Sequence, residues 1–272
     1  MDGGTVTGVV RRPGPVRLEV DGGLATITLS RPDKANAIDA EVAAGLVAAV
    51  SDCRGQQIVV RAILLRGDGD HFCAGGQVED LLVEPTAAQA MVTTLTRDLN
   101  ATVRMLVEAT VPVVVAVRGF AVGGGLGLAC AGDLVVAGTS ARFLSGFSRI
   151  GLAPDCGVGY TLPRLIGQRA ATDMVLTNKV VDADEAMRLG LVSRVVPDEE
   201  LDSVAAQLAR GLATGPSLAF AESKRMLRDD MSSLAAHLVD EAAVLRFLCL
   251  TSDAQRGIRA QFGAGTPLFR GE

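Results

Sequence analysis

The 272-residue chain has no tryptophan, one tyrosine, two histidines and five cysteines. The cysteines are odd in number and form no Cys-x-x-Cys pair, which favours reduced thiols over disulfides or a zinc site. Two histidines give little support for a Ser-His-Asp hydrolase or a histidine-based metal site, so we expect no bound metal. We expect each cysteine to be a small buried hydrophobic residue: Cys53, Cys73, Cys130, Cys156 and Cys249.

The chain also lacks a basic charge excess and a long apolar run. Its net charge is −5 and aromatic residues make up 3% of it, which argues against nucleic acid as a partner. Uncharged stretches such as 119–132 are interrupted by glycines and fall short of the about 20 apolar residues that a membrane-spanning helix needs. Residues 1–15 lack the apolar core of a secretory signal, so we expect a flexible leader and a cytoplasmic protein without membrane partners.

Strand and helix patterns alternate over most of the chain. Two alternating runs joined by Asp21-Gly22-Gly23 predict a hairpin over 16–30. Buried strands and amphipathic helices follow in turn, which predicts an α/β core over 16–197 with a mostly parallel centre. Past Pro197, three amphipathic helices predict a helical region over 198–272 that covers the core or packs against another subunit. The expected strands are 58–67, 111–119 and 133–138, and the expected helices of the core include 40–53, 86–108 and 124–131.

Two glycine-rich turns each follow a predicted strand. The stretch "GFAVGGGLGLACAGD" (119–133) does not fit a dinucleotide-binding fingerprint, because Cys130 stands where the third small residue is required. Free backbone N–H groups at the start of a helix attract anionic oxygen. The turn at Gly75-Gly76 and the turn before Gly124 could therefore each aim one N–H at the same oxygen, as in an oxyanion hole. Taken singly, each is also typical of a tight turn where a helix packs closely on a sheet.

Five ordered segments carry a family resemblance: "LSRPDKANAID", "RAILLRGDGDHFCAGGQVEDL", "VPVVVAVRGFAVGGGLGLACAGDLVVAGTSARF", "IGLAPDCGVGYTLPRLIG" and "DEAMRLGLVSRVVP". Over about 30–197 the chain resembles the enoyl-CoA hydratase/isomerase, or crotonase, superfamily. The resemblance implies an α/β fold with a ββα spiral core and a C-terminal helical trimerisation region. It also implies an acyl-CoA substrate that itself carries the coenzyme A, no permanently bound cofactor, and homotrimers that are often stacked as hexamers.

The resemblance also implies roles for individual residues. The backbone N–H groups of Gly76 and Gly124 would polarise the thioester carbonyl and hold its enolate. The acyl group would occupy a pocket formed by loops near 78–100 and 143–149. Residues implied for the coenzyme A channel are Lys34, Ala35, Asn36, Ala74, Gly75 and Gln77.

Hydratases of the family use two glutamates, and both are missing here. The two positions fall on Gly127 and Phe147, which can neither activate water nor deliver a proton. We expect Gly127 and Phe147 to border the acyl group instead. The remaining acid is Asp155, in a segment where some family isomerases and 4-chlorobenzoyl-CoA dehalogenases keep an acid.

Two roles for Asp155 are open at this point. Pro-Asp-x-Gly is ordinary turn chemistry, and the residue could cap the following helix. An apolar setting would instead raise its pKa and suit a proton shuttle. The favoured hypothesis is a double-bond isomerase using Asp155; the alternatives are a hydratase, a dehalogenase-like enzyme with Asp155 as nucleophile, and a non-catalytic acyl-CoA-binding homologue.

Overall fold

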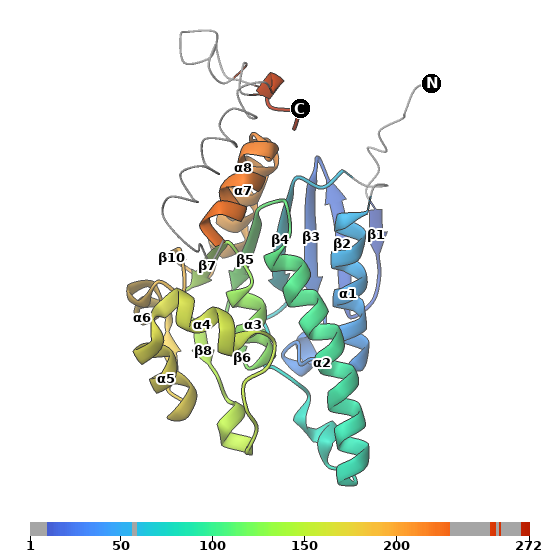
Figure 1. Cartoon of the computed structure of the whole chain (residues 1–272), viewed down its shortest axis with the longest axis vertical. Helices are drawn as coiled ribbons and strands as arrows, with labels where there is room; N and C mark the ends of the chain where they lie inside the picture. Colours follow the sequence, from blue (N-terminus) through green and yellow to red (C-terminus); the bar gives the residue numbers. More distant parts are fainter. Residues whose placement is uncertain (1–9, 56–58, 229–250, 254–255, 257–267) are drawn as a thin grey trace.

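A seven-stranded sheet forms the centre of the molecule (Figure 1). The computed structural model describes residues 10–55, 59–228, 251–253, 256 and 268–272. The first three strands in the sheet order run antiparallel and the others are parallel, as predicted for the centre of the core. In sheet order they are β1 (Val10–Arg12), β2 (Val16–Asp21), β3 (Leu24–Leu29), β4 (Ala62–Gly67), β5 (Val113–Val117), β7 (Leu134–Gly138) and β10 (Arg194–Val196).

The predicted hairpin is confirmed, and part of the expected leader forms a strand. β2 and β3 are joined by Gly22 and Gly23, whose φ angles of 56° and 83° favour glycine. The expectation of a flexible leader over 1–15 is wrong for Val10–Arg12, which pairs with β2 as β1. Without this pairing β2 would be an edge strand with unpaired backbone groups. Residues 1–9 lie outside the described residues.

Local sequence signals account for the elements next to the hairpin. The side chain of Asp39 accepts a hydrogen bond from the Val42 N–H and caps helix α1 (Ala40–Arg54), as its position predicts. All five residues of β5 are buried, as its run of valines indicates. β4 begins only at Ala62, later than the apolar run that starts at 58.

A second, three-stranded sheet was not predicted. It consists of β6 (Phe120–Val122), β8 (Arg142–Leu144) and β9 (Val181–Asp182). The chain passes from β5 in the large sheet to β6 in the small one and then into helix α3 (Gly124–Cys130). It then repeats this path from β7 through β8 to later helices, which is the expected ββα repetition. Strands this short carry too few residues to show a period in the sequence.

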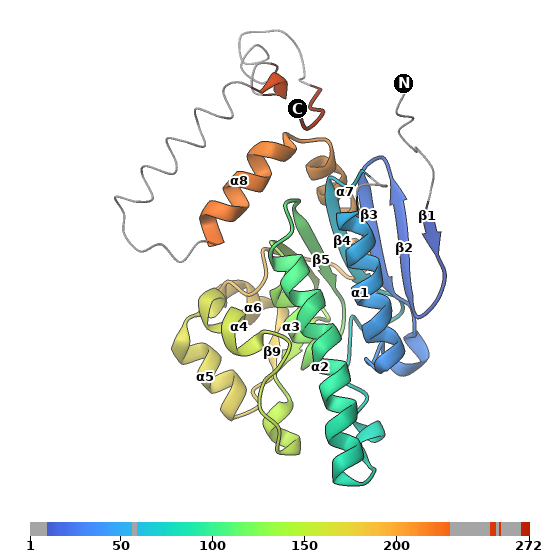
Figure 2. The ribbon, with the colours of Figure 1, turned by 45° about the vertical axis from the view of Figure 1, so that its right-hand side comes forward.

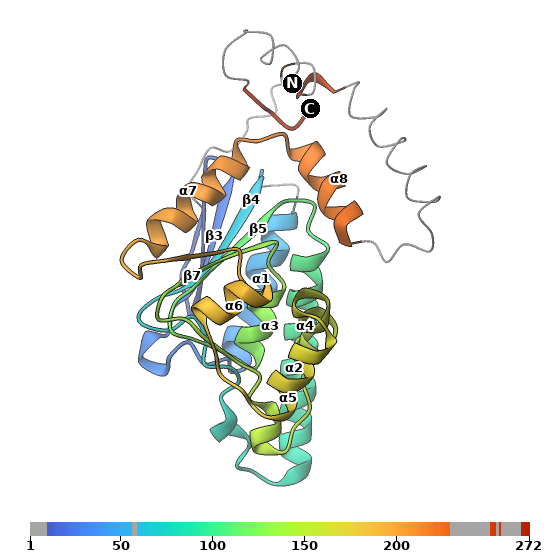
Figure 3. The ribbon, with the colours of Figure 1, turned by 90° about the vertical axis from the view of Figure 1, so that its left-hand side faces the viewer.

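Helices cover both faces of the large sheet. Figures 2 and 3 show α1, α2 (Pro85–Val107) and α3 on one face, with α7 (Leu201–Ala213) on the other. Buried alanines of α7 pack against Leu24, Leu64 and Val114. The helical region after Pro197 therefore begins by covering the core, one of the two alternatives that the sequence left open.

The remaining helices lie between elements of the core in the chain order or follow α7. α8 is the second of the three predicted C-terminal helices, and the third lies almost entirely outside the described residues. Trimerisation stays a prediction. No helix in the described ranges is both long and apolar enough to cross a membrane. The helices other than α1, α2, α3 and α7 are η1 (Pro32–Lys34), η2 (Val78–Leu81), η3 (Phe147–Ile150), α4 (Val158–Ile166), α5 (Gln168–Leu176), α6 (Ala183–Leu189) and α8 (Ser217–Arg228).

A charged cluster around Asp133 joins α8 to the core. The Asp133 carboxylate accepts hydrogen bonds from the Val113 N–H at 2.7 Å, and Lys224 and Arg228 each approach it at 2.8 Å. The Arg228 guanidinium also donates to the carbonyls of Ala131 and Gly132. A cation at these carbonyls complements the C-terminal end of α3. Burial lowers the pKa of Lys224, which the neighbouring carboxylate partly offsets.

We expect Asp133→Ala to reduce the free energy of unfolding by about 3 kcal/mol, because it leaves a buried lysine without its counter-charge. Urea unfolding measures this. The control is Asp202→Ala on α7, where the side chain is 47% exposed and pairs with Arg66 and Arg118. Exposed pairs contribute about 0–1 kcal/mol. Equal losses in the two variants would contradict the structural importance of the Asp133 cluster.

Candidate active site

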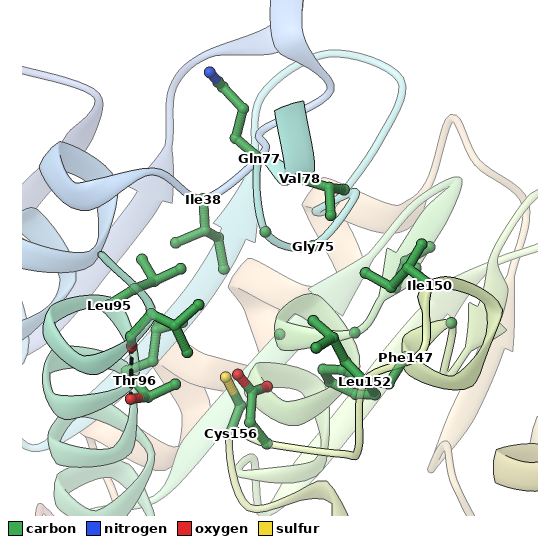
Figure 4. A pocket seen from close by; sticks show the side chains of 18 of the residues that line it. Ile38, Gly75, Gln77, Val78, Leu95, Thr96, Phe147, Ile150, Leu152 and Cys156 are labelled. Carbon is green, nitrogen blue, oxygen red and sulfur yellow. Dashed lines mark hydrogen bonds between the residues drawn. The ribbon is translucent and has the colours of Figure 1, made fainter. Parts of the chain in front are cut away.

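An apolar cavity of about 680 Å³ opens between α2, the start of α3 and the loop that contains η3. Figure 4 shows Ile38 and Leu95 on one side of it and Phe147, Ile150 and Leu152 on the other, with the Cys156 thiol between them. The expectation of loops near 78–100 is wrong for most of that segment, because helix α2 supplies this wall. Both glycine turns also line the cavity, through Gly75, Gly76, Gly123 and Gly124.

The two glycine turns are neighbours because backbone hydrogen bonds hold them together. Cys73 pairs with β6: its N–H donates to the Phe120 carbonyl at 2.8 Å, and its carbonyl accepts from the Val122 N–H at 3.0 Å. Gly75 then turns with φ of 91°. A Cβ at Gly75 would lie 2.8 Å from the Val122 carbonyl oxygen, so both its conformation and its contacts require glycine.

Gly76 and Gly124 each present a free backbone N–H at this place. In the parts of the chain that the structure describes, neither N–H donates a hydrogen bond. Gly124 is the first residue of α3, where N–H groups have no partner within the helix. The structure thus brings together the two groups predicted to form an oxyanion hole.

Close packing on α3 sets the position of the first turn. A Cβ at Gly125 would lie 2.5 Å from the Cys73 carbonyl oxygen and 2.8 Å from the Cys73 Cβ. Glycine therefore lets the chain before Gly76 lie directly against the helix. The interpretation as close helix packing is therefore confirmed at this turn, and the oxyanion hole stays a prediction.

Three aspartates line the cavity, and their partners differ. Asp39 caps α1 and also pairs with Arg31, so hydrogen bonds and charge lower its pKa. Asp80 accepts from the Gln77 side chain at 2.8 Å. Asp155 keeps a buried oxygen, Oδ1, that has no hydrogen-bond partner among the described residues. Of these three described aspartates, only Asp155 therefore has a buried carboxyl oxygen without a hydrogen-bond partner.

The structure bears on the first of the two roles left open for Asp155. Helix α4 starts at Val158, and its capping residue is Gly157, without a side-chain cap. The Asp155 backbone carbonyl accepts from the Val158 N–H at 2.9 Å, while its side chain lines the cavity. Burial raises the pKa of Asp155, and the Cys156 thiol partly offsets this increase. The side chain is thus not a helix cap, while the Asp155 carbonyl closes the predicted turn. Proton transfer by Asp155 stays a prediction.

The two positions at which the family's hydratases carry glutamates differ in whether they line the cavity. Phe147 lines the cavity, and its ring lies 3.6 Å from where a Cβ on Gly123 would be, so it forms a wall beside the second turn. The expectation that Gly127 borders the acyl group is wrong. Gly127 is absent from the cavity lining, because Cys156 lies against it.

The residues expected along the coenzyme A channel fall into two groups. Ala74, Gly75 and Gln77 line the cavity, whereas the loop of Lys34, Ala35 and Asn36 adjoins it without lining it. Ala35 accepts from the Ala74 N–H at 3.0 Å, and Lys34 reaches Gln77 at 3.3 Å. The Asn36 side chain is buried and holds the backbone of three other residues: Arg31, Asp68 and His71. Contact of this loop with coenzyme A stays a prediction.

Two further features of the cavity were not foreseen. Leu95 and Leu99 project from α2, and their spacing of four residues is the signal that could have placed them. The Ser145 hydroxyl is fully buried at the cavity and has no partner among the described residues. No sequence pattern distinguishes such a serine from any other.

The cysteines are buried, as predicted, at the four described positions: Cys53, Cys73, Cys130 and Cys156. Burial raises the pKa of the Cys73 thiol to about 12 and raises that of Cys156 as well. Neither thiol is therefore ionised near neutral pH, so the two thiols near the cavity are not activated nucleophiles. Cys249 lies outside the described residues.

The described residues thus combine an α/β fold with two free backbone N–H groups at one apolar cavity. The family model "Enoyl-CoA hydratase/isomerase" matches residues 19–271. The chain therefore belongs to the enoyl-CoA hydratase/isomerase, or crotonase, family.

Relatives within the family carry different activities in their names. A "probable enoyl-CoA hydratase" of Rhodobacter capsulatus is 37% identical over 257 residues, 94% of this chain and 98% of that protein. The 1,2-epoxyphenylacetyl-CoA isomerase of Escherichia coli is 35% identical over 255 residues, 93% and 97% of the two chains. A solved structure of an enoyl-CoA hydratase/isomerase from Cupriavidus metallidurans has a TM-score of 0.86 and 29% identity, covering 96% of this chain and 98% of that one. These similarities establish the crotonase fold. Because the relatives carry different activities in their names at similar identity, they do not identify the reaction of this chain.

We expect Asp155→Asn to increase the free energy of unfolding near pH 7–8, because it removes an ionised group from a desolvated place. The folded-state pKa of Asp155 is raised above its unfolded value of about 3.9. The stabilising contribution of the acid is therefore complete below the unfolded pKa and is lost as pH rises through the folded pKa. Chemical denaturation of both proteins across pH 4–8 measures the difference, which should grow with pH. A difference independent of pH would contradict the burial argument.

Proposed function

We propose that this protein is an acyl-CoA isomerase that shifts a carbon–carbon double bond by proton transfer through an enolate. The observation that carries the proposal is the combination of two free N–H groups with one unpartnered carboxyl oxygen at the same apolar cavity. Membership of the family supports a coenzyme A thioester as the substrate. The substrate carries the coenzyme A, so the reaction needs no bound cofactor.

The proposed reaction uses Asp155 twice. Its carboxylate takes a proton from the carbon next to the thioester, and the electrons of that C–H bond move toward the thioester oxygen. The N–H groups of Gly76 and Gly124 stabilise the resulting negative charge. Asp155 then returns the proton to the far carbon of the original double bond, which leaves the double bond in its new position and the carboxylate regenerated.

Hydration is less well supported by the same cavity. Adding water requires one group to activate the water and another to deliver a proton to carbon. Phe147 offers no such group, and Gly127 is separated from the cavity by Cys156. The apolar lining also favours a hydrophobic acyl group over free water.

Two substrates distinguish the alternatives: a 3-enoyl-CoA for isomerisation and crotonyl-CoA for hydration. We expect isomerisation by the wild-type protein and a loss of about 10²- to 10⁴-fold in Asp155→Asn. Asp173→Asn on α5, a 52% exposed acid outside the cavity lining, is the control and should retain full activity. Hydration of crotonyl-CoA that is unaffected by Asp155→Asn would overturn the proposal in favour of a hydratase. Turnover of no thioester would favour a non-catalytic acyl-CoA-binding protein, and chloride release from a chlorinated aroyl-CoA would favour a dehalogenase.

The pH dependence of isomerisation provides a second test. The first proton transfer needs the carboxylate, so kcat/KM should fall as pH drops through the pKa of Asp155. Because burial raises that pKa, the fall should occur at a higher pH than for an ordinary aspartate at about 3.9. Initial rates from pH 4 to 9 measure it. A rate that stays constant down to pH 4 would contradict the role of Asp155 as base.

A further inference from the structure

Gly127 lies directly against the backbone of the segment that carries Asp155. A Cβ at Gly127 would lie 2.5 Å from the Cys156 carbonyl oxygen and 2.6 Å from the Cys156 Cβ. Contacts this short involve the main chain, so a flexible side-chain tip cannot move aside to relieve them. No side chain fits at 127 unless the Cys156 segment moves away from α3.

The Cys156 segment is also held in an unusual conformation. Cys156 has φ of 49°, a left-handed backbone that costs a residue other than glycine about 1–2 kcal/mol. The residue is 1% exposed, and its sulfur lies 3.4 Å from where a Cβ on Gly124 would be. Surrounding packing must therefore maintain this turn. The contact with α3 at Gly127 is part of that packing.

The Asp155 side chain is held by its own segment, because the hydrogen bonds that its carboxyl accepts come from the Cys156 thiol and from its own backbone N–H. Its Oδ1 has no hydrogen-bond partner among the described residues, and its backbone carbonyl is tied to Val158 at the start of α4. The direction of the carboxyl group therefore depends on where the backbone of 155–157 lies. The absence of a side chain at Gly127 in turn determines how closely that backbone approaches α3.

We infer that Gly127 is a positioning residue for Asp155, acting through the backbone of Cys156, and that a side chain at 127 and the carboxyl at 155 exclude each other in this protein. The inference rests on the proposed function. Its consequence is that a glutamate placed at 127, one of the two acid positions of the family's hydratases, would displace Asp155 and would not simply add a second acid.

The test compares Gly127→Ala with Gly159→Ala. Gly159 lies in α4, close in sequence to Asp155, and a Cβ there meets no atom within 4 Å. We expect Gly127→Ala to lower kcat for 3-enoyl-CoA isomerisation by about a hundredfold, since small displacements of reacting groups have effects of this size. Affinity for a saturated acyl-CoA, which keeps the thioester carbonyl but has no double bond to shift, should change little, because the free N–H groups of both glycine turns remain. Gly159→Ala should match the wild type in both respects.

A second readout does not depend on catalysis. Displacing the Cys156 segment should expose its thiol, so iodoacetamide should modify Cys156 faster in Gly127→Ala than in Gly159→Ala, as followed by peptide mass spectrometry. Cys53 and Cys73 should stay protected in both variants, which separates local displacement from general unfolding. If the wild-type protein shows no turnover that depends on Asp155, the proposed function fails, and this labelling still decides whether Gly127 positions the segment.

A compensating substitution guards against a variant that fails to fold. Cys156→Gly removes the Cβ that lies 2.6 Å away and adopts the φ of 49° without strain. Gly127→Ala combined with Cys156→Gly should therefore recover part of the kcat lost in Gly127→Ala, with Cys156→Gly alone as its reference. Wild-type kcat and wild-type protection of Cys156 in Gly127→Ala would overturn the inference. So would a Gly127→Glu protein that hydrates crotonyl-CoA while it keeps isomerisation that depends on Asp155.

Discussion

The candidate site depends on direct packing of backbone against helix α3. Two chain segments, one before Gly76 and one after Asp155, lie so close to this helix that neither Gly125 nor Gly127 has room for a Cβ. Protein interiors are packed densely enough that a single methyl group in such a contact forces the chain to move. The helix is thus a common support for the turn at Gly75-Gly76 and for the segment that carries Asp155, and small changes in its position would affect both.

This arrangement leaves polar groups without partners, which usually destabilises a folded protein. The Oδ1 atom of Asp155 and the hydroxyl of Ser145 are both buried at the cavity without a hydrogen bond among the described residues. A buried polar atom without a partner costs about 1–3 kcal/mol. Such groups are more easily explained at a site that a ligand completes than in a core that must be stable alone. The left-handed backbone of Cys156 adds to the same local cost.

Patterns of adjacent residues predicted the large helices and strands well, but they could not predict contacts between segments far apart in the sequence. The Asp39 cap, the hairpin at Gly22-Gly23 and the valine strand β5 each follow from a few adjacent residues. The small sheet did not, because its three short strands pair only with each other and with the bridge at Cys73.

The same limit applies to the site. The family's motifs pointed to Gly76, Gly124 and Asp155 as candidate site residues, and all three line the same cavity. The motifs did not show that Gly127 faces Cys156, because that contact joins α3 to a segment far along the chain. Sequence alone also could not separate a helix cap from a cavity acid at Asp155, since the two differ only in where the side chain points.

The position of Asp133 links the C-terminal helices to the chemistry of the cavity. Asp133 follows α3 closely and is tied to Lys224 and Arg228 of α8, and Arg228 also holds the carbonyls at the end of α3. A helix of this length spans only about 10 Å, so its two ends move together. Substitutions in α8 can therefore shift the Gly124 N–H without touching any residue of the cavity. The C-terminal helix α8 is thus a support for a residue of the cavity that it does not itself line.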